Sequence, residues 1–187
     1  MSARLVETVV TYLVAKEPPH APPPMPAGSH LALMKVDGIP LHYYRYLYHA
    51  VGVNWLWFER LLLDDAALAA KVHREGVDIF VLYANGAPAG YYELDFSRSE
   101  RTNLVYFGLL PEWTSQKIGP WLLGSAVQEA FSRGAKELTV NTCTLDHAAA
   151  LPLYQRLGFR PVTRETRLLT IPAHIPIPGH IAARAAP

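Results

Sequence analysis

The segment from Asn103 to Pro120 contains the residues best suited to binding an anion. β-Forming residues from Asn103 to Leu110 run into a tight loop from Pro111 to Gly119, and Pro120 can occupy the first position of a helix. A strand that leads through such a loop into a helix presents unpaired backbone N–H groups and the positive end of the helix dipole to a ligand. The sequence therefore predicts a site for a phosphate-bearing ligand.

A strand and a short helix follow this segment and complete a βαβ unit. The pattern predicts a strand from Lys136 to Thr144, then a short helix that bears Tyr154 and ends before Gly158. Asp146 is the expected N-cap of this helix, because an aspartate side chain can accept a hydrogen bond from the first helical turn. The rest of the chain is expected to be organised around this unit.

Other strands and helices are expected on both sides of the unit. The Asn85-Gly86 pair lies between β-rich segments, which is a strong signal for a hairpin. The proline-rich segment EPPHAPPPMPAG should be an extended surface connector, since proline excludes it from helices and central strands. The remaining expected elements are strands at Leu5–Val14, His30–Val36, Val77–Ala84, Ala89–Phe96 and Pro161–Ile171, a helix from Pro40 through HYYRYLYHAV, and a helix through DDAALAAKVH.

Composition excludes several classes of protein. The 187 residues are 50% hydrophobic, so the chain can fill a core of its own. With 17 basic and 16 acidic residues and no basic run, nucleic-acid binding is not expected. No stretch approaches the roughly 20 apolar residues of a membrane span, and the single cysteine allows no internal disulfide, so we expect a cytoplasmic protein that does not bind a membrane. Eight histidines lack metal-site spacing, so no metal is expected.

Aromatic residues are concentrated between positions 43 and 57. One interpretation is that they pack helices onto the sheet. The other is that some of them line a pocket for an apolar or cationic acceptor, with Tyr43, Tyr46, Trp55 and Trp57 as the candidates. Glu59 either binds a cationic acceptor or lies on a solvated helix face.

Two stretches of the sequence resemble the GNAT superfamily of acyl-CoA-dependent N-acetyltransferases. FGLLPEWTSQKIGPWLL is similar to the acyl-CoA signature, and LDHAAALPLYQRLGF is similar to the second motif. The resemblance covers Ile79 to Thr170 and extends back to His30. It implies an α/β (α+β) fold with a mixed, centrally splayed sheet of about six to seven strands and helices on both faces. We expect residues 1–29 to form a strand and connector, 30–171 the acyltransferase domain, and 172–187 a tail that packs on the domain or is disordered.

The resemblance also implies residues that bind acetyl-CoA. Main-chain groups of Leu109 and Leu110 would hold the acetyl carbonyl and the pantetheine amides. His147 matches a position that contacts the pantetheine arm. The loop residues that would wrap the pyrophosphate are Thr114, Ser115, Gln116, Lys117, Ile118 and Gly119, with Pro120 opening the helix. Thr114 replaces the usual arginine or glutamine, and Lys117 replaces a glycine, which adds a positive charge beside the pyrophosphate.

The proton transfers of the reaction need an acid and a base. By resemblance, Tyr154 would protonate the departing CoA thiolate. A primary amine with a pKa of about 10 must lose a proton before it attacks, and a carboxylate facing the cleft could accept it. Glu93 in YYELDF is the preferred base, and Asp95 is the second choice because strand alternation places both on one face. The alternative is that both are surface carboxylates.

The sequence therefore predicts an acetyl-CoA-dependent N-acetyltransferase that acts by direct transfer in a ternary complex. The expected acceptor is a primary amine of a small molecule, aromatic or cationic. One alternative is a catalytically silent acyl-CoA-binding regulatory module, and another is an acetyltransferase for protein or peptide amines. Apart from these ligands, the one further partner that we consider is a second copy of the chain in a homodimer.

Overall fold

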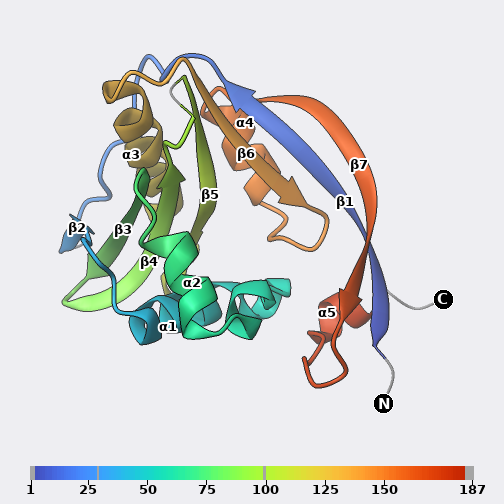
Figure 1. Cartoon of the computed structure of the whole chain (residues 1–187). Coiled ribbons are helices and arrows are strands. Elements are labelled where there is room, and N and C mark those ends of the chain that lie inside the picture. The colour runs from blue at the N-terminus through green and yellow to red at the C-terminus, as the bar shows by residue number, and fades with distance from the viewer. Residues whose placement is uncertain (1–2, 29, 99, 184–187) are drawn as a thin grey trace.

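The computed structural model describes residues 3–28, 30–98 and 100–183, which form one seven-stranded mixed sheet with helices on both faces (Figure 1). The strand order is β2-β3-β4-β5-β6-β1-β7. The strands are β1 (Arg4–Ala15), β2 (Leu31–Lys35), β3 (Val77–Ala84), β4 (Ala87–Asp95), β5 (Arg101–Leu109), β6 (Glu137–Cys143) and β7 (Arg160–Ile171). The helices are α1 (Leu41–Gly52), α2 (Asp65–Val72), α3 (Ile118–Ser132), α4 (Ala150–Arg156) and α5 (Gly179–Ala182), with 3-10 turns η1 (Val53–Trp55), η2 (Glu59–Leu62) and η3 (Pro111–Trp113). This architecture confirms the expected fold class.

The two central parallel strands separate along their length. Strands β5 and β6 pair only where Arg101 to Asn103 lie beside Glu137 to Thr139. Beyond Asn103 the two strands diverge, as Figure 1 shows, and the edge of β5 that faces β6 has no strand partner within the described residues. The expected splay of the sheet is therefore confirmed.

Strand β1 lies inside the sheet, between β6 and β7. It runs antiparallel to both and pairs with β7 from Arg4 to Val14, but with β6 only from Val10 to Ala15. Its N-terminal half therefore forms a two-stranded ribbon with β7 that extends past β6 (Figure 1). The predicted strand is correct, but its position in the sheet was not predicted.

Each face of the sheet has its own apolar core. On one face, α3 packs onto β5, β6 and α4, with Leu122, Ala126 and Val127 fully buried. On the other face, α1 packs onto β3 and β4 through positions three and four apart, Tyr44, Leu47, Tyr48 and Val51. The proline-rich connector lies against α3, where a Cβ on Gly124 would come 2.8 Å from Pro23 Cδ.

Several local predictions can be compared with the structure. The hairpin turn is confirmed, because Asn85 and Gly86 both have positive φ, as a type I′ turn requires. Helix α3 begins at Ile118 and not at Pro120, because Lys117 takes a left-handed conformation (φ 61°) and ends the loop as the N-cap. Ile181 of α5 is buried beside Val6. No described helix is long and apolar enough to cross a membrane.

Candidate functional site

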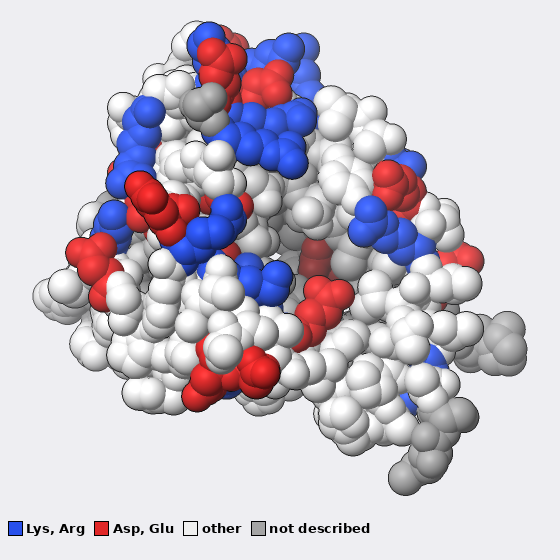
Figure 2. Space-filling view, viewed as in Figure 1, with Lys and Arg blue, Asp and Glu red and all other residues white. Residues whose placement is uncertain are grey.

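A cavity of about 920 Å³ opens where β5 and β6 separate. Its walls come from β5, β6, α4, the loop before α3, the turns after α1, and the ribbon of β1 and β7. Figure 2 shows the same face of the molecule hollowed near its centre, with acidic and basic side chains around the hollow. A volume of this size suits a small-molecule ligand.

One end of the cavity is built from the loop before α3. Thr114, Ser115, Lys117, Gly119 and Pro120 line it. Ser115 and Lys117 both have left-handed backbones (φ 63° and 61°), and the first N–H groups of α3 have no partner within the helix. These donors, the helix dipole and the lysine charge suit an anion, as the sequence predicted.

Two of the predicted loop residues lie outside the cavity lining. The Gln116 side chain turns back, and its Nε2 donates to the carbonyl of Glu112 at 2.8 Å. Ile118 is fully buried in the core beneath α3. Both serve the loop and the helix rather than the cavity surface.

The wall formed by β5 offers main-chain groups. Leu109 lines the cavity, whereas Leu110 is 3% exposed and its N–H already donates to the carbonyl of Ala89 at 2.9 Å. The Leu110 N–H is therefore not free for a ligand. The unpaired edge of β5 before Leu109 supplies the exposed main-chain groups instead.

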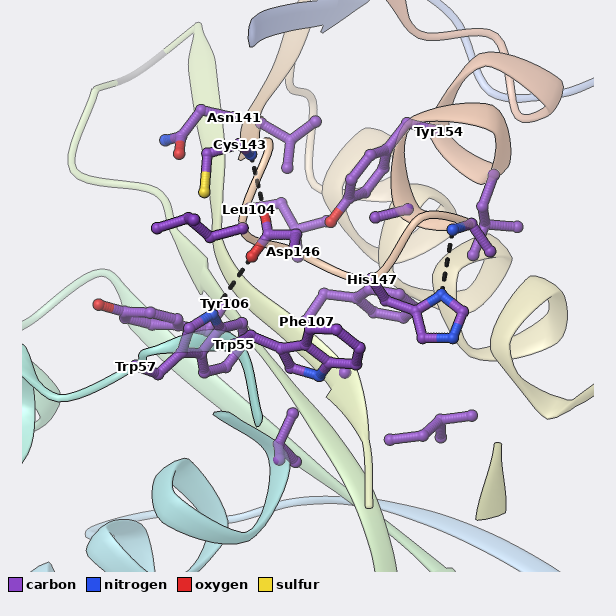
Figure 3. A pocket seen from close by; sticks show the side chains of 18 of the residues that line it. Trp55, Trp57, Leu104, Tyr106, Phe107, Asn141, Cys143, Asp146, His147 and Tyr154 are labelled. Carbon is purple, nitrogen blue, oxygen red and sulfur yellow. Dashed lines mark hydrogen bonds between the residues drawn. The ribbon is translucent and has the colours of Figure 1, made fainter. Parts of the chain in front are cut away.

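Tyr154 on α4 projects into the middle of the cavity. Its ring packs against Phe107 and Phe159, with centroids 6.3 and 5.6 Å away, and Figure 3 shows its hydroxyl directed towards Asp146. Burial raises the pKa of the phenol, and the Asp146 carboxylate raises it further, so the hydroxyl keeps its proton at neutral pH. His147 also lines the cavity, and its Nδ1 accepts from the N–H of Ala149 at 3.0 Å.

Asp146 lines the cavity and does not cap α4. Its Oδ2 accepts from Thr142 Oγ1 at 2.7 Å and from the N–H of Cys143 at 2.9 Å. The predicted N-cap is wrong, because donors at the end of β6 bind this carboxylate and the N-cap of α4 is Ala149, three residues later. The other oxygen, Oδ1, lies 3.4 Å from Trp57 Nε1 (Figure 3).

The aromatic candidates divide between cavity and surface. Trp55, Trp57 and Glu59 line the cavity. Tyr43 does not, and its hydroxyl instead bonds that of Tyr83 at 2.9 Å, while Tyr46 is 48% exposed and stacks on Tyr43. The phase of α1 explains this division, because positions 44, 47, 48 and 51 point inward and positions 43 and 46 point outward.

Neither predicted base lies in the cavity. Glu93 is 1% exposed, and Arg60 donates to both of its oxygens at 2.9 and 3.1 Å while the Tyr44 hydroxyl donates at 2.8 Å. Burial raises the pKa of Glu93, and its bonds with Arg60 and Tyr44 act in the opposite direction. Asp95 pairs with Arg74 at 2.6 Å and accepts from the N–H of Ser97 at 2.9 Å. The structure thus gives both carboxylates other partners.

Sequence reasoning missed several residues that line the cavity. Asp146 was assigned to capping, although its place directly after a parallel strand was a usable signal. Tyr12 and Arg167 belong to the β1–β7 ribbon, which local patterns cannot place. Tyr48 and Tyr106 were assigned only to a helix and a strand. Within the described residues, no group of three or more His, Cys, Asp and Glu side chains could hold a metal ion.

Comparison with known proteins points to one family. Residues 44–159 match the model of the acetyltransferase (GNAT) family. No curated protein sequence matches the chain significantly. Many solved structures share the fold. Their sequence identities to this chain are low, 18% for example, and such a likeness establishes a common fold but not a common function.

Three of these structures, all of N-acetyltransferases, illustrate the extent of the similarity. A GCN5-related N-acetyltransferase from Kribbella flavida is 18% identical, with a TM-score of 0.56 over 97% of this chain and 63% of that one. An aminoglycoside N-acetyltransferase in complex with CoA is 20% identical, with a TM-score of 0.55 over 76% and 95%. The ribosomal-protein-S18-alanine N-acetyltransferase from Escherichia coli is 19% identical, with a TM-score of 0.58 over 75% and 94%. The chain therefore spans less than two thirds of the Kribbella protein.

Proposed function

The chain belongs to the acetyltransferase (GNAT) family, and from this membership we propose that it transfers the acetyl group of acetyl-CoA to a primary amine of a small molecule. The observation that supports this most strongly is that one continuous cavity in the β5–β6 split is lined both by the loop before α3 and by Tyr154. An anion-binding end and a proton donor are thus parts of one space.

The residues present fit acetyl-CoA. The loop from Thr114 to Gly119 would bind the pyrophosphate through N–H groups at the start of α3, with Lys117 adding a positive charge. The free edge of β5 would pair with the pantetheine amides and polarise the thioester carbonyl near Leu109. His147 would contact the pantetheine arm, as its place in the lining allows.

Direct transfer requires a nucleophile, an acid and an acceptor for the proton of the amine. The amine nitrogen attacks the thioester carbonyl carbon, a C–N bond forms as the nitrogen gives a proton to a base, and the C–S bond breaks. Tyr154 then gives its proton to the thiolate, and the raised pKa of this phenol keeps that proton available at neutral pH. Glu93 is excluded from the role of base in this proposal because Arg60 and Tyr44 bind its oxygens.

We favour a small-molecule acceptor over a peptide because the cavity has a volume of about 920 Å³, in the range of small-molecule sites, and its lining includes the aromatic side chains of Tyr12, Trp55 and Trp57. The similar structures include an aminoglycoside N-acetyltransferase and a ribosomal-protein-S18-alanine N-acetyltransferase, so the fold serves both classes.

Thermal unfolding with acetyl-CoA, CoA or ATP tests the donor site. A ligand that binds only the folded state raises the melting temperature. We expect both CoA species to raise it and ATP to leave it unchanged. An equal shift with ATP would point to a general nucleotide site, and no shift with millimolar acetyl-CoA would refute the proposed function.

A further inference from the structure

Two carboxylates line the cavity among the described residues, and they differ in depth. Glu59 is exposed at the mouth, whereas Asp146 is half-buried beside Tyr154. The cations of the lining have other positions. Lys117 belongs to the loop before α3, Arg156 ends α4, and Arg167 donates to Glu165 at 2.8 Å and to the Tyr12 hydroxyl at 2.5 Å. The carboxylate nearest the reacting centre is therefore Asp146.

The Asp146 side chain is held in place with one oxygen still able to accept. Oδ2 has two donors, Thr142 Oγ1 and the Cys143 N–H, at 2.7 and 2.9 Å. Among the described residues, Oδ1 has only the long contact of 3.4 Å from Trp57 Nε1. A carboxylate oxygen can accept two hydrogen bonds, so Oδ1 can bind a ligand N–H without losing its present neighbours.

The surroundings of Oδ1 suit a positively charged group attached to an apolar body. Trp57 packs against Tyr48 and Tyr106, with ring centroids 5.6 and 5.0 Å apart, so its indole is fixed beside the carboxylate. Figure 3 shows Trp57 and Tyr154 on opposite sides of Asp146. An ammonium here would gain a charge-assisted hydrogen bond to Oδ1.

On the basis of the proposed function, we propose that Asp146 binds the acceptor as an alkylammonium ion through Oδ1 and then accepts its proton. The substrate class is accordingly a cationic primary alkylamine with an apolar or aromatic body. Asp146 takes the place that the sequence had given to Glu93.

The proton balance closes within the pair of Asp146 and Tyr154. The ammonium gives one proton to Asp146, which releases it to solvent and returns to the carboxylate. The neutral amine attacks the thioester carbon, and the nitrogen gives a second proton to Asp146 as the C–N bond forms. Tyr154 protonates the thiolate as the C–S bond breaks, and Asp146 returns its proton to Tyr154 directly or through one water. One proton is released per amide formed.

The first test needs no variant. Titration of the acetyl-CoA-free protein with CoA present, followed by tryptophan fluorescence, compares 2-phenylethylammonium with the uncharged 2-phenylethanol. We expect at least about tenfold tighter binding of the ammonium, as a charge-assisted hydrogen bond implies. Equal affinities would overturn the inference, whatever the behaviour of the variants.

The second test uses Asp146→Asn, with Asp37→Asn as a control because the Asp37 side chain is 90% exposed. We expect Asp146→Asn to abolish the preference for the ammonium and to lower kcat/KM for 2-phenylethylamine about 10²-fold or more. The loss should be much smaller for aniline, which is already unprotonated at neutral pH. Asp146→Glu should recover part of the ammonium preference.

The outcomes separate the inference from the function it rests on. If acetyl-CoA binds and is turned over but Asp146→Asn behaves as Asp37→Asn does, the inference fails and the proposed function stands. If acetyl-CoA does not bind the wild-type protein, the proposed function fails first. An equal loss for aniline and 2-phenylethylamine would show that Asp146 does not recognise the ammonium and would overturn the inference.

Discussion

Glu93 and Asp146 are carboxylates in two regions of one sheet with opposite environments. Glu93 lies under α1, 1% exposed, with both oxygens bound by Arg60. Asp146 follows β6 at the split and keeps one oxygen directed into the cavity. A carboxylate with a full set of internal partners stabilises a conformation, whereas one with a spare acceptor can bind a substrate. Residue type and strand position alone do not distinguish the two.

Substitution beside the buried Glu93 should give the largest effect on stability. Arg60→Met leaves Glu93 buried without its counter-ion, which should lower the free energy of unfolding by about 3–5 kcal/mol. The double variant Arg60→Met/Glu93→Leu should recover most of that loss, because it removes the buried charge. Urea unfolding measures both, with Arg74→Met as the matched surface pair, for which less than about 1 kcal/mol is expected.

The same variant has a defined pH dependence. Burial raises the pKa of Glu93, and Arg60 opposes that shift, so removing Arg60 raises this pKa further. A carboxyl whose pKa is higher in the folded than in the unfolded state makes the protein less stable as pH rises. The deficit of Arg60→Met should be small near about pH 4 and grow towards neutral pH. A deficit that is constant with pH would contradict the description of Glu93 as a buried charge.

Substitution of a residue that lines the cavity should have a large effect on activity and little effect on stability. Tyr154→Phe removes the hydroxyl but keeps the ring between Phe107 and Phe159, so unfolding should change little. We expect kcat for acetyl transfer to fall about 10²-fold or more. Tyr92→Phe, a buried tyrosine outside the cavity lining, is the control in the same steady-state assay. Unchanged kcat in Tyr154→Phe would remove it from the reaction.

A smaller effect on activity is expected at the wall of the cavity that Trp57 forms. A Cβ on Gly52 would lie 2.2 Å from Trp57 Cβ, so Gly52→Ala must displace the indole. We expect kcat/KM for the amine to fall about tenfold, because a small misplacement in a reacting site is costly. The KM for acetyl-CoA should not change. Gly179→Ala is the control, because nothing lies within 4 Å of the added atom. An equal effect of Gly52→Ala on the KM values of the amine and of acetyl-CoA would contradict separate binding of the two substrates at different ends of the cavity.

The smallest effect is expected at Lys117. Its left-handed backbone costs roughly 1 kcal/mol in a residue other than glycine, so Lys117→Gly should leave the free energy of unfolding within about 1 kcal/mol of the wild type or slightly above it. Loss of the charge should raise the KM for acetyl-CoA a few-fold at low salt and less at high salt. Lys117→Gln should show the same KM change without the gain in stability. A KM that does not depend on this charge would exclude contact with the pyrophosphate.

Local patterns predicted much of the fold, and long-range contacts decided the rest. The strand, loop and helix around Leu109 and the hairpin at Asn85 follow from periodicity and turn chemistry, which act within a few residues. The position of β1 depends on pairing with β7, more than 140 residues away in the sequence, so no local signal could place it. The ion pair of Glu93 could not be predicted from the pattern of its strand either, because its partner Arg60 lies in a separate 3-10 turn.

Within the site, side-chain direction was the limit of sequence reasoning. Tyr154 and Trp57, both named as site residues from the sequence, were found in the cavity lining. Tyr43 and Tyr46 were not, since a helix of mixed aromatics gives no unique phase until its partner is known. Asp146 was assigned to α4 because a cap is a local explanation, whereas its actual donors lie on β6.

The central claim is that the cavity between β5 and β6 transfers an acetyl group from CoA to an amine. Incubation of the wild-type protein with acetyl-CoA and a panel of primary alkylamines, with free thiol and amide measured in the same samples, tests it most directly. The account predicts that one amine at least yields equal amounts of CoA thiol and N-acetyl amide, and that Tyr154→Phe greatly slows both. Binding of acetyl-CoA with no amide from any amine would contradict it and favour an acyl-CoA-binding regulatory module.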